Sequence, residues 1–412
     1  MRSNFSKLWL GQSLSVFGHQ ISTMSIPLIA VVVIKGNPLQ MGFLQAVSYT
    51  PILLFSLVVG TLVDRHRKVP ILVVSDVARF ITLLMIPCLY IFDMLTIIHL
   101  YFVAFFLGIF TTFFDIAYLS LVTKVVTENE IIKANSKLEG TRSVSMAVSP
   151  GIAGMLIQLL SAPFAIIFNI GAFMLSSLVL ATIKEEKDVK SIEEVTTKRK
   201  SLLLEAKSGY QVIINNAKLR VLALSTALLN LFSTMMAPIF LLFLTQELKL
   251  NPFFTGIVLA STGIGGIIGS VLASKIANLV GKERSLVISL IMGAFSVLLL
   301  PVVSDNSIYS ILYLILTQLL LGVSITIFRV NQISIRMMIV PINTQGRVNA
   351  LLRLIMMSLV PIGSLIGGVL GEILGEKGTL FISGIGLFFT FFVTKYFLAK
   401  SKSFTPKNNQ TA

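Results

Sequence analysis

Twelve apolar segments recur along this chain, and they constrain its fold more than any other feature. A helix that crosses a membrane needs about 20 predominantly apolar residues. The segments lie approximately at residues 8–34, 40–62, 71–92, 97–122, 143–160, 163–183, 219–244, 253–276, 285–303, 309–335, 348–374 and 379–398. Only 12% of the 412 residues are charged, against about a quarter in soluble domains. We therefore predict an all-α membrane protein with twelve transmembrane helices.

The longest polar stretch, residues 184–218, separates six predicted helices from six others. We expect residues 1–183 and 219–399 to form two pseudo-symmetric six-helix bundles, with a linker at 184–218 and a tail at 400–412. Four apolar residues of the linker stand at helical spacing, namely Leu203, Ala206, Tyr210 and Ile213. This spacing predicts a short amphipathic helix on the inner membrane surface.

The distribution of basic residues predicts the orientation, because Lys and Arg are retained on the cytoplasmic side. With both termini in the cytoplasm, 28 of the 33 Lys and Arg residues lie in or beside cytoplasmic segments. Lys35, Lys249 and Lys377 fall outside, and Arg79 and Arg329 fall within helices. We expect a multi-pass protein of a bacterial-type inner membrane, with the linker and the tail in the cytoplasm.

Composition excludes several classes of function. The net charge of +15 is divided among short segments between apolar runs, so it forms no soluble face for nucleic acid. The single Cys and the three His residues have no ligand-like spacing, so no metal site or cofactor is expected. No nucleophile-base pair or nucleotide-binding loop is evident, which argues against an enzyme. The glycines of residues 263–269 predict close helix packing in lipid.

The two halves share an internal repeat with one constant offset, which we call the repeat register. The matches are Leu107-Gly108 with Leu321-Gly322, Phe114 with Phe328, Asn135 with Asn349, and Leu138 with Leu352. In the same register Asp115 corresponds to Arg329 and Glu139 to Arg353, so charged positions are kept while their sign is inverted. Parallel repeats of this kind usually enclose a transport site near the membrane midplane. We expect Asp115 and Arg329 to approach each other when the cytoplasmic end closes.

The loop between the second and third predicted helices carries a motif. It reads Gly60-Thr61-Leu62-Val63-Asp64-Arg65-His66-Arg67-Lys68. This loop resembles the signature loop of the major facilitator superfamily. The residues that match the signature are Gly60, Leu62, Asp64 and Arg65. The resemblance implies that Gly60 lets helices pack closely and that Asp64 accepts hydrogen bonds at a neighbouring helix N-terminus.

Further motifs resemble the macrolide-efflux-type branch, the drug:proton antiporters of the third group. The residues that carry this likeness or its gating role are Arg67, Lys68, Asp76, Arg79, Asn135, Glu139, Arg142, Pro150, Gly151, Gly154, Arg329, Asn349 and Arg353. The resemblance implies a monomer that binds a small-molecule substrate and protons within the lipid bilayer. Family antiporters often have an embedded Arg in the fourth helix, where this chain has Gly108 and Thr111.

Two residues are candidates for proton coupling. His19 lies midway through the first predicted helix, and an imidazole titrates near neutral pH. The alternative is a neutral, hydrogen-bonded His19. Asp115 lies in the fourth predicted helix, where the alternative role is a salt bridge with Arg142 or Arg79.

The first, fourth, seventh and tenth predicted helices are expected to line a largely apolar cavity. Candidate cavity residues are Gln12, Gln20, Phe114, Asn230, Met235, Asn331 and Gln332. The resulting hypothesis is a secondary active exporter of a small, largely apolar compound, working by alternating access in exchange for protons. The alternatives are a siderophore or lipid exporter of the same superfamily, and a membrane receptor or scaffold that does not transport.

Overall fold

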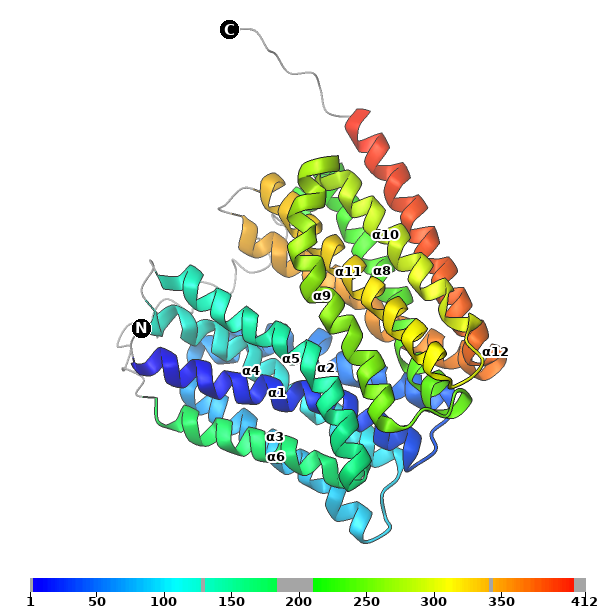
Figure 1. The fold of residues 1–412 in the computed structure, drawn as a ribbon. Helices are drawn as coiled ribbons and strands as arrows, with labels where there is room; N and C mark the ends of the chain where they lie inside the picture. Colours follow the sequence, from blue (N-terminus) through cyan, green and yellow to red (C-terminus); the bar gives the residue numbers. More distant parts are fainter. Residues whose placement is uncertain (1–2, 127–129, 184–209, 341–343, 404–412) are drawn as a thin grey trace.

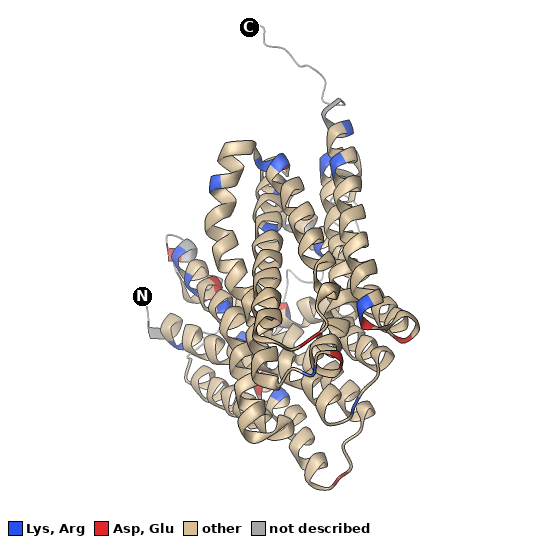
Figure 2. Ribbon diagram, turned by 45° about the vertical axis from the view of Figure 1, so that its right-hand side comes forward, with Lys and Arg blue, Asp and Glu red and all other residues tan. Residues whose placement is uncertain are grey.

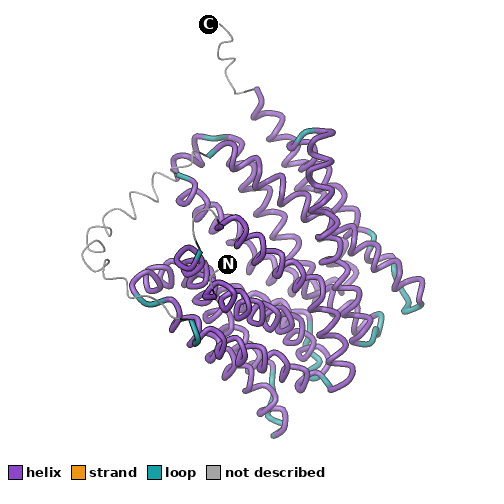
Figure 3. Tube along the Cα trace, turned by 60° about the vertical axis from the view of Figure 1, so that its left-hand side comes forward, coloured by secondary structure: helices purple, strands orange, loops and turns teal. Residues whose placement is uncertain are grey.

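The computed structural model describes residues 3–126, 130–183, 210–340 and 344–403. Within these residues every regular element is a helix, and short connections such as residues 33–37 and 92–96 join helices of the same group (Figure 3). Large apolar side chains on the outer surface are exposed, for example Val74 (64%) and Leu316 (65%). An outer surface of this kind is stable in lipid rather than in water.

The helices form two groups along the chain. The first group contains α1 (Ser3–Val32), α2 (Pro38–Arg65), α3 (Lys68–Ile91), α4 (Ile97–Val125), α5 (Ile131–Leu160) and α6 (Ala162–Ala181). The second contains α8 (Ala217–Leu242) with the π-helix η2 (Phe243–Glu247), α9 (Pro252–Val280), α10 (Lys282–Leu298) with the 3-10 helix η3 (Leu300–Val302), α11 (Ile308–Ile339) and α12 (Gln345–Ser403).

Ten helices of the described residues are long and apolar enough to cross a membrane. A further candidate is α2, whose parts Pro38–Ser56 and Val58–Arg65 meet at a bend of 56°. The 59 residues of α12 are interrupted at Gly375, where φ is 72° and ψ is 177°. Only a residue without Cβ adopts such a positive φ readily, so Gly375 separates α12 into two helical arms.

Polar residues fix several helix starts. The Asn37 side chain accepts from the Gln40 backbone N–H at 2.8 Å, and Asn251 accepts likewise from Phe254 at 2.9 Å. Before α11, the Asp305 carboxylate accepts from the Ser310 and Ser307 hydroxyls and from the Ser307 backbone N–H. These hydrogen bonds, led by that from Ser310, lower the pKa of Asp305. Each cap satisfies backbone donors that the first helical turn leaves unpaired.

The two groups meet through two helix pairs, α2 with α12 and α5 with α9. Both crossings depend on glycine pairs. A Cβ on Gly42 would lie 2.8 Å from the Gly368 Cα, and a Cβ on Gly154 would lie 3.0 Å from the Gly256 Cα. The backbones therefore touch where side chains would hold them apart.

The glycine contacts follow the internal repeat. In the repeat register Gly256 corresponds to Gly42, and Gly368 corresponds to Gly154. The contact between Gly42 and Gly368 is thus the counterpart of the contact between Gly256 and Gly154. Residues that correspond in the sequence repeat therefore also make corresponding packing contacts. Small residues of α9 also pack as expected, since Gly263 abuts Ala147 of α5 and Gly265 abuts the Leu319 backbone of α11.

The molecule has two ends. We call the end where α1 begins and α2 ends the terminus side. We call the opposite end, where α1 ends and α2 begins, the far side. On the far side, buried apolar residues of both groups form one cluster that includes Leu28 and Ile29 with Ile239 and Leu242. The Gln246 Nε2 also donates to the Gly36 carbonyl oxygen at 3.3 Å. The far side is therefore closed by packing.

On the terminus side each group keeps its own buried clusters. Phe5 and Leu121 belong to a cluster of the first group, whereas Leu219 and Leu352 belong to one of the second. In Figure 1 the first group extends toward the N-terminus and the second toward the C-terminus, so the groups diverge in this direction. The arrangement is closed on the far side and separated on the terminus side.

Some predicted boundaries are wrong. The helix expected to start at 143 starts at Ile131, so Asn135, Glu139 and Arg142 belong to α5 rather than to a loop. A hydropathy profile does not detect the first part of α5, because that part is polar. The expected linker ends before Ala217, where α8 begins, and residues 210–215 are helical. Residues 184–209, with Leu203 and Ala206 of the predicted amphipathic helix, and residues 404–412 of the tail lie outside the described residues.

Candidate functional site

A buried ion pair lies at the centre of the first group. The Arg79 Nη1 is 3.3 Å from the Asp76 Oδ1, and the two residues are one helical turn apart on α3. Asp76 is fully buried and Arg79 is 1% exposed. The Ser15 hydroxyl donates to the Asp76 Oδ1 at 3.0 Å, and the Ser176 hydroxyl donates to the Oδ2 at 2.5 Å. Both carboxylate oxygens are therefore satisfied.

Arg79 is held by further contacts. Its Nη1 donates to the Ser15 hydroxyl at 2.8 Å and its Nη2 to the Phe110 carbonyl at 3.3 Å. The guanidinium lies 4.3 Å from the centre of the Phe114 ring and 5.1 Å from that of Phe173. These cation-π contacts join α3 to α4 and α6, and the hydrogen bonds of Ser15 add α1. We read the cluster as a rigid core of the first group.

The second group has no charged counterpart of this ion pair. In the repeat register Leu290 corresponds to Asp76 and Gly293 to Arg79. Leu290 is buried, and the Gly293 position faces the Ser324 side chain. The charged core is thus specific to the first group.

The loop that resembles the superfamily signature is held by Lys68. Its ammonium donates to the carbonyl oxygens of Val63 at 2.8 Å, Asp64 at 3.1 Å and His66 at 2.8 Å, which satisfies the end of α2. The side chains of Leu62, Asp64, Arg65 and Arg67 are exposed.

Two expectations for this loop fail in this conformation. The Asp64 carboxylate makes no hydrogen bond or ion pair within the part of the chain that the structure describes. A Cβ on Gly60 would meet nothing within 4 Å, so Gly60 mediates no close packing here. Both residues lie on the terminus side, where the two groups are apart.

Charged residues gather toward the helix ends, while most helices are uncharged along their length (Figure 2). Five charged side chains lie about 12 to 16 Å along their helices from the terminus side, at 1.5 Å per residue. We call them the inter-group charge set, which comprises Asp115 of α4, Glu139 and Arg142 of α5, Arg329 of α11 and Arg353 of α12. All are exposed except Asp115, which is half-buried. Among the described residues none of the five makes a hydrogen bond or a direct ion pair.

The charge set connects the two groups electrostatically. Asp115 lies within electrostatic range of Arg79, Arg142 and Arg353. Arg329 lies within range of Arg142 and Glu139. A charged side chain at this depth costs several kcal/mol unless it faces water or a partner. The set lies where charges of the two groups interact, and we call this region between the groups on the terminus side the gap.

Two of these interactions are counterparts in the repeat. Arg329 corresponds to Asp115 in the repeat register, and Arg353 corresponds to Glu139. The interaction of Asp115 with Arg353 thus matches that of Arg329 with Glu139, with each sign inverted. Among the described residues, Asp115 forms no ion pair with Arg329, its expected partner.

His19 faces the same charged region from α1. The side chain is half-buried and lies within electrostatic range of Arg79 and Arg142. It makes no hydrogen bond within the described residues, which disfavours the hydrogen-bonded alternative in this conformation. Gln20 beside it is also half-buried.

Most other predicted cavity residues are buried between helices. Gln12, Phe114, Met235, Asn331 and Gln332 are each less than 5% exposed. The Asn331 Nδ2 donates to the Ser285 hydroxyl at 3.0 Å, which links α11 to α10. The Asn230 Nδ2 donates to the Met356 carbonyl at 2.7 Å, which links α8 to α12. In this conformation these side chains stabilise helix packing rather than line the gap.

The remaining motif residues also have defined places. Pro150 and Gly154 form the contact of α5 with α9, and a Cβ on Gly151 would approach the Ala260 Cβ at 3.9 Å. Asn135 is exposed near the start of α5, and Asn349 is half-buried near the start of α12. Sequence reasoning missed Ser15 and Ser176, although small polar residues within apolar helices were an available signal.

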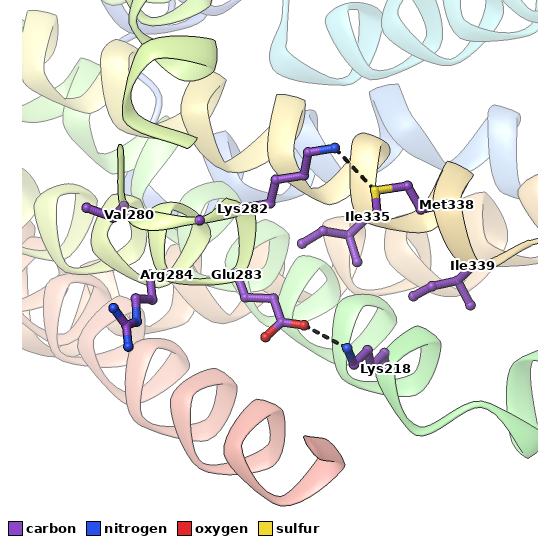
Figure 4. Close-up of a pocket in the computed structure, with 9 residues that line it drawn as sticks. Lys218, Val280, Lys282, Glu283, Arg284, Ile335, Met338 and Ile339 are labelled. Atoms are coloured by element: carbon purple, nitrogen blue, oxygen red, sulfur yellow. Dashed lines mark hydrogen bonds and ion pairs between the residues drawn. The ribbon is translucent and has the colours of Figure 1, made fainter. Parts of the chain in front are cut away.

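A surface pocket of about 430 Å³ opens on the terminus side of the second group (Figure 4). Lys218 and Glu283 form an ion pair of 2.8 Å at its wall, and the Lys282 ammonium lies 3.2 Å from the Met338 sulfur. Its lining contains no member of the inter-group charge set. Within the described residues no group of three or more His, Cys, Asp or Glu side chains could hold a metal ion.

Comparisons with known proteins agree with this architecture. The family model described as transmembrane secretion effector matches residues 1–409. Macrolide efflux protein A of Streptococcus pyogenes is 21% identical over 382 residues, which cover 92% of each chain.

A bacterial homologue of the iron transporter ferroportin in its inward-facing state superposes with a TM-score of 0.77 at 18% identity, over 96% of this chain and 98% of that one. The same kind of homologue in an outward-facing state gives a TM-score of 0.60 at 17% identity, over 97% and 100% of the two chains. With a family model that spans nearly all its residues, the chain belongs to the transmembrane secretion effector family of the major facilitator superfamily.

Proposed function

We propose that this chain is a secondary active exporter that moves a small, largely apolar compound, such as a macrolide, out of the cell in exchange for protons. Counting the two arms of α12 separately gives twelve spans, in two six-helix halves of residues 1–183 and 219–399. The terminus side faces the cytoplasm of a bacterial cell, as the distribution of basic residues favours. The family and the macrolide efflux relative support export.

One observation carries the mechanism, namely that the two groups are packed together on the far side and separated on the terminus side. Alternating access requires a site that opens to one face at a time. With the terminus side in the cytoplasm, this conformation is the one that loads cargo. The higher similarity to an inward-facing than to an outward-facing ferroportin homologue supports this assignment.

The inter-group charge set supplies a means of closing the terminus side. When the groups approach, Asp115 meets Arg353 and Glu139 meets Arg329, and two ion pairs form that are absent in the present conformation. Pairs formed in only one state shift the equilibrium toward that state. The sign inversion between the repeats makes both pairs attractive. The pairs therefore favour the outward-open state.

Protons would enter this cycle through His19 or Asp115. Both lie beside Arg79 and Arg142, and neither has a hydrogen bond among the described residues. Addition or loss of a proton at either residue changes the charge of the gap, and with it the balance between open and closed states.

The experiment is a comparison of a deletion strain with a strain that overproduces the protein, screened against antibiotics and dyes. Overproduction should lower accumulation of at least one compound, and a protonophore should remove the effect. Asp115→Asn should abolish the difference, whereas Asp93→Asn, in an exposed turn, should retain it. Equal accumulation in both strains across the panel would refute export of such compounds.

The orientation has its own test. A reporter fused after Lys400 should behave as cytoplasmic. A cysteine at Asn37, in a Cys88→Ser background, should react with an impermeant reagent from outside. Labelling of that cysteine only after the membrane is opened would reverse the assignment of the two sides.

A further inference from the structure

We propose that the π-helical turn η2 is the latch of the far side, and that Gln246 on this turn holds the far side closed. When the far side opens, η2 rewinds as an α-helix and withdraws Gln246 from the first group. The inference rests on the proposed export function, because a transport cycle requires the far side to open. It assigns a positioning residue to the gate opposite the inter-group charge set.

The turn η2 bonds directly to the first group. The Gln246 Nε2 donates to the carbonyl oxygen of Gly36, in the connection between α1 and α2, at 3.3 Å. Gly36 is buried and offers a backbone atom, so no side-chain rotation in the first group can break this hydrogen bond. The bond is lost only when Gln246 moves or the two groups separate.

The next residue of the turn anchors η2 to the second group. The Glu247 carboxylate lies 3.1 Å from the Lys377 ammonium, which also donates to the Ser304 hydroxyl at 3.1 Å. Lys377 lies shortly after Gly375, where the two arms of α12 meet. Adjacent side chains of one turn therefore reach different groups, and a change in the winding of the turn alters the bridge between them.

The winding of η2 gives the latch its movement. In this turn the Leu248 backbone N–H donates to the Phe243 carbonyl oxygen at 2.9 Å, five residues back instead of the four of an α-helix. Rewinding the turn as an α-helix rotates the side chains that follow by about 100°. Gln246 then points away from Gly36, and the hydrogen bond between the groups is gone.

The contact with Gly36 stabilises the wide form of the turn. Because π-helices are rare and concentrate at functional sites, a π-helical turn indicates support from contacts outside its own backbone. The hydrogen bond from Gln246 gives such support only while the two groups are together on the far side. A contact that exists in one state shifts the equilibrium toward that state. The wide turn and the closed far side therefore favour each other.

The connection after η2 closely matches its repeat counterpart in the first group. Lys35 and Lys249 correspond in the repeat register, and both have a left-handed backbone, with φ of 56° and 53°. Asn37 and Asn251 also correspond, and the side chain of each caps the helix that follows. The way the chain turns is thus common to both groups.

The latch itself occurs in one group only. In the repeat register Val32 corresponds to Gln246, Val33 to Glu247 and Leu250 to Gly36. The helix α1 is an α-helix up to Val32. A valine side chain cannot donate to a carbonyl oxygen, so the counterpart hydrogen bond cannot form. The π-helical turn and the polar residues that bridge the groups occur together, which indicates a specific function rather than a general way of ending these helices.

Spin labels on the far side test the latch. Met94 and Tyr309 are exposed residues of different groups, and both are labelled in full-length Cys88→Ser protein in lipid nanodiscs. Gln246→Ala should raise the ratio of open to closed far side about two- to ten-fold, as the loss of one neutral hydrogen bond permits. Gln246→Glu keeps the shape but lacks the donor when ionised, so it should act in the same direction.

A matched control lies on the same turn. The Thr245 hydroxyl donates to the Leu241 carbonyl oxygen at 2.7 Å, within the same helical segment. Thr245→Val should therefore leave the distances unchanged. Deletion of Thr245 removes one residue from the wide turn and should open the far side. Addition of Gln246→Ala to the deletion should then have no further effect, because the same contact is already lost.

The outcomes distinguish this inference from the proposed function. Unchanged distances in folded Gln246→Ala protein would overturn the latch while leaving export intact. Fully additive effects of the deletion and Gln246→Ala would show that the winding of η2 does not control Gln246, which also contradicts the proposal. A far side that opens as expected, in a protein that moves no compound in proteoliposomes, would support the latch and count against export.

Discussion

Replacement of one glycine should shift the balance between the two transport states. A Cβ on Gly42 would lie 2.5 Å from the Ser364 carbonyl oxygen and 2.8 Å from the Gly368 Cα, where ordinary contacts are 3.4 to 4 Å. Gly42→Ala must therefore move α2 and α12 apart by about 1 Å. Overpacking of this size costs about 1–3 kcal/mol.

Because this contact lies on the closed far side, the cost falls on the present state and is relieved when that side opens. A shift of about 1–3 kcal/mol changes the ratio of the states about 5- to 150-fold. Gly256→Ala, the repeat counterpart, places a Cβ 2.6 Å from the Pro150 carbonyl oxygen and should act in the same direction. The two changes lie at separate crossings, so their effects should add.

The assay is distance measurement between spin labels on the far side. Met94 and Tyr309 are exposed at 60% and 81% and belong to different groups, so they suit labelling in a Cys88→Ser background. Gly42→Ala should lengthen the distance between the labels. Gly171→Ala in α6 is the control, since its Cβ meets nothing within 4 Å. Identical distances in Gly42→Ala and the control would refute the reasoning.

Three further changes test other parts of the structure. Asp76→Asn should destabilise the protein by about 3–5 kcal/mol, because it leaves the buried Arg79 guanidinium unpaired. The melting temperature in detergent should fall for this variant and stay unchanged for the control Asp93→Asn, which alters an exposed residue. Asp115→Arg and Arg353→Asp should each impair export, and the double swap should restore part of it if the two groups pair on closure. Hydrogen bonds lower the pKa of Asp305. The ionised carboxylate of Asp305 therefore stabilises the folded protein at neutral pH, and this stabilisation is lost as the pH falls through the lowered pKa. Asp305→Ala should remove this part of the acid sensitivity of thermal unfolding.

Sequence reasoning predicted the all-helical membrane fold and the family, because both depend on local apolar length and on motifs. The repeat register was also detectable, and it relates the contacts at Gly42 and Gly154. Helix starts were less predictable where polar residues face the gap. The polar beginning of α5 reads as a loop in a hydropathy profile, although it is helical in the structure.

Side-chain partners could be predicted only within one helix. Asp76 and Arg79 are one turn apart, so their pairing follows from helical geometry. Their bonds to Ser15 and Ser176 depend on how α1 and α6 pack, which no local pattern specifies. Asn331 and Met235 are polar or adaptable residues that suggest a binding site, yet tertiary packing buries both. Neither the hydrogen bonds expected of Asp64 nor the close packing expected of Gly60 is present among the described residues.

The inverted signs of the two repeats also bear on assembly. In the first half the corresponding positions hold Asp115 and Glu139, and in the second half they hold Arg329 and Arg353. Two copies of the first half, docked as the halves are here, would place carboxylates against carboxylates, and two copies of the second would place guanidiniums together. Such repulsion discriminates against wrong partners. Separately expressed halves should therefore recognise each other rather than their own kind, and a chain cut between residues 184 and 209 should reassemble from one copy of each piece.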